Sequence, residues 1–169
     1  MKKVLVILVV MCAAFAVQAQ TKVGHINSSE LIDLLPEADS IQKQLNKEQE
    51  MWKRILGEKE NDAKVKYNAL MQLLDNPEVS DSEKEIKTQE VENLQKQYQE
   101  LQQRANENLQ LKQQELLTPL LDKVKKTIAE VAKENGYAYV MDTTEGSGII
   151  YSDASYDLMP LVKAKLGVK

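Results

Sequence analysis

The sequence predicts a mainly α-helical protein in which a long antiparallel helical hairpin is inserted into a small β-containing body. Three observations lead to this fold class. Residues 37–134 contain one glycine, Gly57, and are rich in Glu, Gln, Lys and Leu, which are strong helix formers. Residues 75–82 interrupt this stretch with Asn-Pro, Asp and Ser, which favour turns. Short stretches rich in β-branched residues and tyrosine lie near the two chain ends.

The first residues have the pattern of an export signal. Lys2 and Lys3 form a positive region, residues 4–17 are apolar, and Ala19 ends a small-residue cleavage motif. We expect a signal peptide over residues 1–19, cleaved near Ala19, because the apolar stretch is too short for a comfortable membrane span.

Cys12 offers an alternative, a lipoprotein signal in which this cysteine carries the lipid. Met11 precedes it where a small residue is expected, which argues against that interpretation. Cleavage near Ala19 removes the only cysteine, so the exported chain can form no internal disulfide. The same cleavage changes the formal net charge from −4 to −6, because it also removes two lysines.

The N-terminal part of the body is expected over residues 20–36. Residues 22–27 include β-branched residues and predict a short strand. Ser28 then suits the N-cap of a short helix, which Pro36 ends before serving as the first residue of the next helix.

The hairpin arm is expected over residues 37–118, with its tip near 75–82. Folding the chain back at the tip places residue n opposite residue 156 − n, which brings Glu37 level with Pro119. Each side of the hairpin then has about 38 residues, or roughly 57 Å of helix. Both ends of the arm are therefore marked by proline, because Pro36 precedes Glu37.

Apolar residues in the arm follow a spacing of three and four, which predicts a narrow coiled-coil seam rather than a wide buried face. Glu48 and Lys59 interrupt this seam. The expected seam residues of the first helix are Ile41, Leu45, Trp52, Ile55 or Leu56, Ala63, Tyr67, Leu70 and Leu74. Those of the second helix are Leu94, Tyr98, Leu101, Ala105, Leu109, Leu116 and Leu117.

The C-terminal part of the body is expected over residues 119–169. The helix continues past Pro119 with a denser apolar pattern, and Gly136 suits the left-handed turn that follows a helix. Strands at 137–142 and 148–151, joined by a turn at 143–147, predict a β-hairpin and a sheet of about three strands. Asp157 suits the N-cap of a last helix over residues 158–166.

The body is too small to be secure alone, since a unit of roughly 70 residues is marginal. In the strand at 137–142, tyrosine and methionine alternate with alanine and valine, so both of its faces are apolar. We therefore predict an oligomer in which other subunits cover this sheet. The residues expected at the subunit contacts are Tyr137, Tyr139, Val140, Met141, Ile149 and Ile150.

Charge and chemistry exclude several classes of function. Residues 37–135 carry 20 acidic and 16 basic residues, which does not suggest nucleic acid or an anionic membrane as the main partner. The sequence contains no Gly-rich phosphate loop, no His-Glu-x-x-His and no Gly-x-Ser-x-Gly. We expect no enzyme activity, no catalytic residue, no metal site and no cofactor. His25 could be a ligand or a pH switch, but a lone histidine in a strand is more often structural.

The order of these elements resembles the Skp/OmpH family of periplasmic chaperones, and the resemblance covers the whole chain after the signal peptide. The residues that carry it surround a long helical hairpin: Ile26-Asn27, Tyr139-Val140-Met141-Asp142, Ile149-Ile150-Tyr151 and Asp157-Leu158-Met159. The resemblance implies a homotrimer whose three helical tentacles surround a central cavity. It also implies ATP-independent holding of unfolded outer-membrane proteins in the periplasm of a Gram-negative bacterium.

This chain departs from the better-known family members in charge. Their tentacles are strongly basic, whereas these arms are slightly acidic, and no basic cluster matches a lipid site. We therefore expect no strong binding to membrane or lipopolysaccharide. The alternative function is a structural periplasmic coiled-coil spacer or adaptor. Such a rod should have an unbroken seam, so Gly57 and the polar seam position Glu48 favour a flexible holder.

Trp52, Ile55 and Leu56 are the candidate contacts with a client, because the three cannot all point into one narrow seam. Tyr67 and Tyr98 fit the seam and are expected to pack between the helices. Gly57 is a hinge candidate, since glycine within a helix costs roughly 1 kcal/mol relative to alanine. The alternative for Gly57 is a tolerated defect that makes room for a neighbouring side chain.

Overall fold

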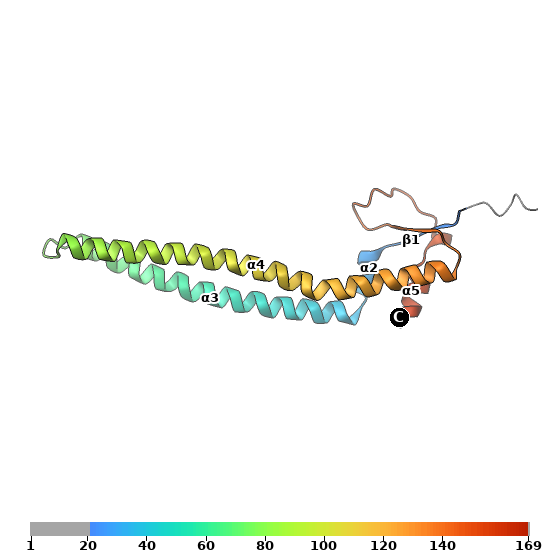
Figure 1. Ribbon diagram of the computed structural model, residues 1–169, viewed down its shortest axis with the longest axis horizontal. Coiled ribbons are helices and arrows are strands. Elements are labelled where there is room, and N and C mark those ends of the chain that lie inside the picture. Colours follow the sequence, from blue (N-terminus) through green and yellow to red (C-terminus); the bar gives the residue numbers. More distant parts are fainter. Residues whose placement is uncertain (1–20, 169) are drawn as a thin grey trace, which may run out of the picture. The chain divides into compact units, whose positions relative to one another are not determined.

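A computed structural model describes residues 21–168, so the expected signal peptide and its cleavage site lie outside the described residues. The described chain is mainly helical, with one two-stranded sheet (Figure 1). Its elements are β1 (Val23–Ile26), α2 (Ser28–Asp33), α3 (Pro36–Leu74), α4 (Asp81–Glu134), β2 (Tyr139–Asp142), the 3-10 turn η2 (Ala154–Tyr156) and α5 (Met159–Leu166).

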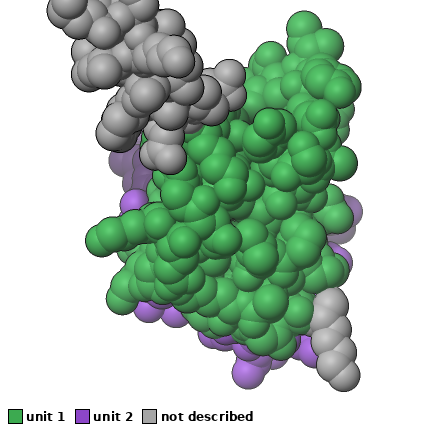
Figure 2. Space-filling model, turned by 90° about the vertical axis from the view of Figure 1, so that its right-hand side faces the viewer, with its two compact units in different colours: residues 1–35, 121–169 green, residues 36–120 purple. Residues whose placement is uncertain are grey.

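The chain divides into two compact units, coloured separately in Figure 2. Residues 36–120 form one unit, which we call the arm. The described residues up to 35 and from 121 form the other, which we call the body. Because α4 ends at Glu134, this helix contributes to both units.

In the arm, α3 and α4 lie side by side and antiparallel (Figure 1). The turn between them is held by short-range hydrogen bonds: the Glu78 N–H donates to Asn76 Oδ1 at 3.0 Å, and the Glu83 N–H donates to Ser80 Oγ at 3.3 Å. Lys66 Nζ lies 3.2 Å from Glu90 Oε1. These two residues are opposite each other when the chain folds back at the tip.

The seam between α3 and α4 is thin. Val91 and Ala105 are buried in α4, and Leu70 is buried in α3. The expectation that Tyr67 packs in the seam is wrong, because its side chain is 45 % exposed. Lys66 and Leu70 lie more deeply on this stretch of α3, and Tyr67 lies to one side, about 100° around the helix from Lys66 and about 60° from Leu70.

The body is organised by a parallel pairing of β1 with β2, in which Val23 aligns with Tyr139 and Ile26 with Asp142. The predicted β-hairpin is therefore wrong, since residues 148–151 form no strand and β2 takes its partner from the other end of the chain. A parallel pair needs a long crossover, which α2, α3 and α4 supply. Gly148 also adopts a φ of 81°, which is not an extended strand conformation.

Side chains from both chain ends form the core of the body. Leu31 of α2, Leu158 directly before α5 and Val162 of α5 are fully buried. Gly24 of β1 is buried beneath this core, where an added Cβ would collide with Leu158 and come within 2.8 Å of the Tyr137 ring. The sheet can approach the core this closely only because residue 24 has no side chain.

Helix ends follow local capping chemistry with two one-residue differences. Gly136, at a φ of 70°, closes α4 as predicted, and the Tyr137 N–H donates to Ala132 O at 2.9 Å. The N-cap of α2 is Asn27 rather than the expected Ser28, whose side chain bonds elsewhere. Helix α5 begins at Met159 rather than 158, although Asp157 Oδ1 still accepts the Met159 N–H at 2.8 Å.

Two glycine substitutions should have opposite effects on stability. Gly24→Ala should lower the free energy of unfolding by about 1–3 kcal/mol, because it overpacks a closed core. Gly57→Ala should raise it by up to about 1 kcal/mol, because nothing lies within 4 Å of the added methyl group. Urea unfolding followed by circular dichroism measures both. A loss of stability in Gly57→Ala would show that the arm needs glycine at this position.

Candidate interaction surfaces

One face of the body sheet is mainly apolar and is not covered by the described residues 21–168. The parallel register puts Val23 beside Tyr139 and His25 beside Met141 on this face. Tyr139 is 63 % exposed, Met141 48 % and Val23 42 %. Val140 points to the opposite, inner face and is half-buried. The two apolar faces predicted for this strand are thus present, and the part of the chain that the structure describes covers only one of them.

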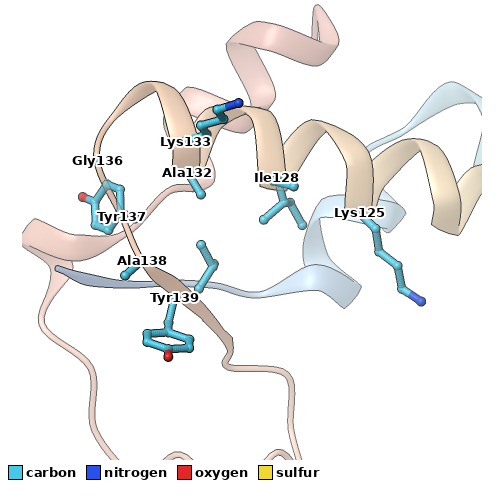
Figure 3. Close-up of a pocket in the computed structure, with 10 residues that line it drawn as sticks. Lys125, Ile128, Ala132, Lys133, Gly136, Tyr137, Ala138 and Tyr139 are labelled. Atoms are coloured by element: carbon cyan, nitrogen blue, oxygen red, sulfur yellow. The ribbon is translucent and has the colours of Figure 1, made fainter. Parts of the chain in front are cut away.

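A groove of about 600 Å³ lies in the body between the last turns of α4 and the segment leading into β2 (Figure 3). Ile128 and Ala132 of α4 point toward this segment, and Lys125 and Lys133 also line the groove. The other wall is residues 136–140. Three of the residues expected at subunit contacts therefore meet here: Tyr137, Tyr139 and Val140.

The remaining residues expected at subunit contacts lie on the loop between β2 and η2. Ile150 is 101 % exposed and its neighbour Tyr151 82 %, whereas Ile149 is half-buried. An interaction site is marked by a contiguous exposed apolar patch rather than by a single exposed side chain. This loop extends the apolar character of the body surface, although the expected strand at 148–151 is absent.

A network centred on Asp142 joins the end of β2 to the start of α2. The Ser28 hydroxyl donates to Asp142 Oδ2, and the Ser28 N–H donates to Oδ1 at 3.2 Å. Thr144 adds its N–H at 3.0 Å and its hydroxyl at 2.6 Å, both to Oδ1. Burial raises the pKa of Asp142, but these hydrogen bonds together outweigh it and lower the pKa to about 2.

His25 joins the sheet to the loop that contains Asp153. Its Nε2 lies 2.9 Å from the Asp153 carbonyl oxygen, and its own carbonyl accepts the Leu158 N–H at 2.9 Å. Residues 21–168 contain no group of three or more His, Cys, Asp or Glu side chains placed to hold a metal ion. In the same part of the chain, no helix combines the length and apolar character that a membrane span requires.

The client-contact candidates of the arm, Trp52, Ile55 and Leu56, are all half-buried. Trp52 and Leu56 line a groove of about 530 Å³ that Ala105 and Leu109 of α4 close from the other side. The Trp52 Nε1 atom is buried and has no hydrogen-bond partner within the described residues. Trp52 thus lies partly in the seam and partly at the groove.

Gly57 lines the same groove and faces open space. Nothing lies within 4 Å of the position that its Cβ would occupy. The alternative that this glycine makes room for a neighbouring side chain is therefore wrong. Its absent side chain leaves a shallow gap in the α3 surface, one turn beyond Trp52.

An exposed apolar row lies near the arm tip and includes Tyr67 and Leu74, which were expected in the seam; for Leu74, as for Tyr67, that expectation is wrong. Tyr67, Met71 and Leu74 are 45 %, 37 % and 39 % exposed, and Ile86 of α4 is 61 % exposed. The signal was available, because 67, 71 and 74 repeat the four-and-three spacing of one helix face. Two apolar rows lie side by side on this part of α3, and only the row containing Leu70 is buried.

Removing the Asp142 carboxylate should make the body less stable at neutral pH. Its lowered pKa means that the stabilisation is complete above the ordinary value of 3.8 and is lost as the pH falls toward about 2. Asp142→Asn should therefore lower the free energy of unfolding by about 1 kcal/mol at pH 7, a modest value because the carboxyl is partly exposed. The difference from wild type should shrink between pH 4 and about pH 2.

Urea unfolding at several pH values measures this effect. Glu145→Gln, an exposed change in the next loop, is the matched control and should leave the pH profile unchanged. A difference between Asp142→Asn and wild type that stays constant down to about pH 2 would contradict the network.

Comparison with known proteins shows which proteins this chain resembles. None of the curated proteins matches the sequence. Among solved structures, the chain is similar to an OmpH-like protein of Caulobacter crescentus CB15 that has been proposed to be an outer membrane chaperone. The TM-score is 0.70 over 88 % of this chain and 85 % of that chain, at 13 % identity, so the likeness concerns the fold. Residues 22–166 match the family model described as "Outer membrane protein (OmpH-like)", and the chain therefore belongs to the OmpH-like family.

Proposed function

We propose that this protein is an ATP-independent holding chaperone of the periplasm, which binds unfolded outer-membrane proteins and prevents their aggregation. The observation that carries the proposal is the family match, which spans both the body and the arm. The arm surface supports it, because a thin seam leaves apolar side chains available to a client. The role involves no catalysis. It also requires export from a Gram-negative cytoplasm, with signal peptide cleavage near Ala19.

The second part of the proposal is a homotrimer held together at the body. Support comes from the uncovered sheet face of Val23, Tyr139 and Met141 and from the exposed Ile150. A second copy that covered these side chains would remove their apolar surface from water. The arms would then surround a shared space, with the groove at Trp52 as the proposed client contact.

The third part concerns how one arm adapts to clients of different size. We assign Gly57 as the hinge, since it lies in the middle of α3 with no side chain packed over it. Glycine lowers the local helix propensity, and the adjacent groove leaves room for bending. Trp52, Ile55 and Leu56 lie on the turns just before the hinge, so bending would change the shape of the client contact.

Charge on the exposed sheet face should break the oligomer. Tyr139→Lys with Met141→Lys should reduce the mass measured by light scattering from a trimer to a monomer, because each subunit contact would bury unpaired charge. Leu111→Lys, at a 65 % exposed position of the arm, is the control and should remain trimeric. A wild-type protein that is monomeric at micromolar concentration would exclude the trimer.

The holding function should be independent of nucleotide and tolerant of salt for an acidic client. Light scattering from a denatured outer-membrane barrel protein should stay low when this protein is added, at about 0.05 M and about 0.5 M sodium chloride alike. Raising the salt shortens the screening length, so tolerance indicates apolar contacts. Trp52→Ala should weaken holding several-fold, with far-UV circular dichroism checking that the arm stays folded.

Leu111→Ala is the matched control for Trp52→Ala and should hold the client as wild type does. Release of the client by salt, with no effect of Trp52→Ala, would mean that capture is electrostatic. Aggregation of the client at every ratio of wild-type protein would favour the alternative role of a structural coiled-coil spacer.

A further inference from the structure

The negative charge of the arm is concentrated near its tip. Residues 64–92, whose two ends lie level with each other across the hairpin, carry seven acidic and four basic residues, whereas the remainder of 37–135 carries thirteen acidic and twelve basic residues. The arm is therefore close to neutral except at the tip. The overall count of 20 acidic and 16 basic residues conceals this distribution.

Most of the acidic groups at the tip are not neutralised. Glu90 alone among the seven forms an ion pair within residues 21–168, with Lys66 at 3.2 Å and Lys87 at 2.9 Å. All of the others are exposed: Asp75, Glu78, Asp81, Glu83, Glu85 and Glu92. Lys64 and Lys66 precede Tyr67 on α3, and Lys84 and Lys87 lie on α4, so residues 67–83 carry no positive charge.

The exposed apolar row lies within this negative field. Tyr67, Met71 and Leu74 share one face of α3 over seven residues, or roughly 10 Å of helix. Asp75 and Glu78 follow directly on the turn, and Glu85 lies on the first turns of α4. The groove at Trp52 carries less negative charge, since its charged lining residues are two acidic and one basic, Glu50, Glu60 and Lys53, together with polar neighbours. The tip thus differs from the groove in charge as well as in position.

We infer that the tip surface, defined by Tyr67, Met71 and Leu74 with the acidic residues around them, binds segments of unfolded polypeptide that combine apolar side chains with net positive charge. The inference rests on the proposed function and specifies which client segments this part of the arm captures. Complementary charge brings a basic segment to the tip. The apolar row then covers its apolar side chains.

The geometry suits an extended segment. Side chains on one face of an extended chain recur about every 6.6–6.8 Å, so a row of roughly 10 Å can contact two of them. Basic side chains on the other face remain free to approach the surrounding carboxylates. An acidic segment of the same apolar content meets the same row but is repelled by those carboxylates.

Two labelled peptides test the inference with the purified protein. They share one length and the same alternating apolar residues, and the intervening positions are lysine in one and glutamate in the other. Fluorescence anisotropy at low salt should give a Kd at least 10-fold lower for the lysine peptide. Added salt should weaken the binding of the lysine peptide and not that of the glutamate peptide.

Two tip variants separate the apolar and charged contributions. The triple variant Tyr67→Gln, Met71→Gln and Leu74→Gln should weaken the binding of the lysine peptide at least 10-fold. Asp75→Asn with Glu78→Gln and Glu85→Gln should weaken it about 3- to 10-fold and reduce its salt dependence. All six side chains are exposed, so the thermal midpoint should remain close to that of wild type.

The controls place the same changes elsewhere on the arm. Leu111→Gln matches the apolar change, and Glu58→Gln with Glu100→Gln and Glu107→Gln matches the charge change. Both controls should bind the lysine peptide as wild type does. Equal binding of the two peptides, or equal loss in tip and control variants, would overturn the inference. Association of intact assemblies through their tips, seen as a mass increase that the tip variants abolish, would also overturn it by assigning the surface to a second copy.

Different measurements test the holding function and the binding of peptides at the tip. Aggregation of a denatured barrel protein in the presence of wild type refutes the holding function. Holding by wild type, with unchanged peptide binding in the tip variants, refutes only the tip inference.

Discussion

The parallel pairing of β1 with β2 is the constraint on which the rest of the structure depends. It joins Val23 to Tyr139, so every residue of the arm lies in the connection between two neighbouring strands. The entropic cost of closing a connection rises only with the logarithm of its length. The arm lowers that cost further, because α3 and α4 fold back on each other at residues 75–80. The contacts in their seam bring the end of the arm back to its start. A long insertion is thus compatible with a small body.

The same pairing determines what the body leaves exposed. Because β2 takes β1 as its partner, the inner face of the sheet packs on the chain and the face of Tyr139 and Met141 does not. Gly24 permits the close approach on the inner side, and Asp142 ties β2 to the start of α2. Good local packing and an uncovered apolar face therefore have one origin, which is why we propose that further copies complete the body.

The arm, in contrast to the body, is held together by few buried contacts. A seam of single buried side chains such as Leu70 and Val91 holds two helices together while most of their surface stays in water. Such an element opens locally more easily than a body core. Polar and charged residues can accumulate on its surface without loss of the fold, so charge can vary along its length. The groove at Trp52 and the more acidic tip beyond Tyr67 are two surfaces of the same helical hairpin.

Local interactions in the sequence alone determined the long helices, the turn between them and the closure of α4 at Gly136. Helix propensity, turn residues and apolar spacing act over a few positions, so they can be recognised in the sequence without knowing which distant segment packs against them. Strand pairing is not local, so the tertiary structure decided that Tyr139 pairs with Val23 and that residues 148–151 form no strand. It also decided that Asn27 caps α2, because the Ser28 hydroxyl donates its hydrogen bond to Asp142 instead. These two residues are 114 positions apart in the sequence.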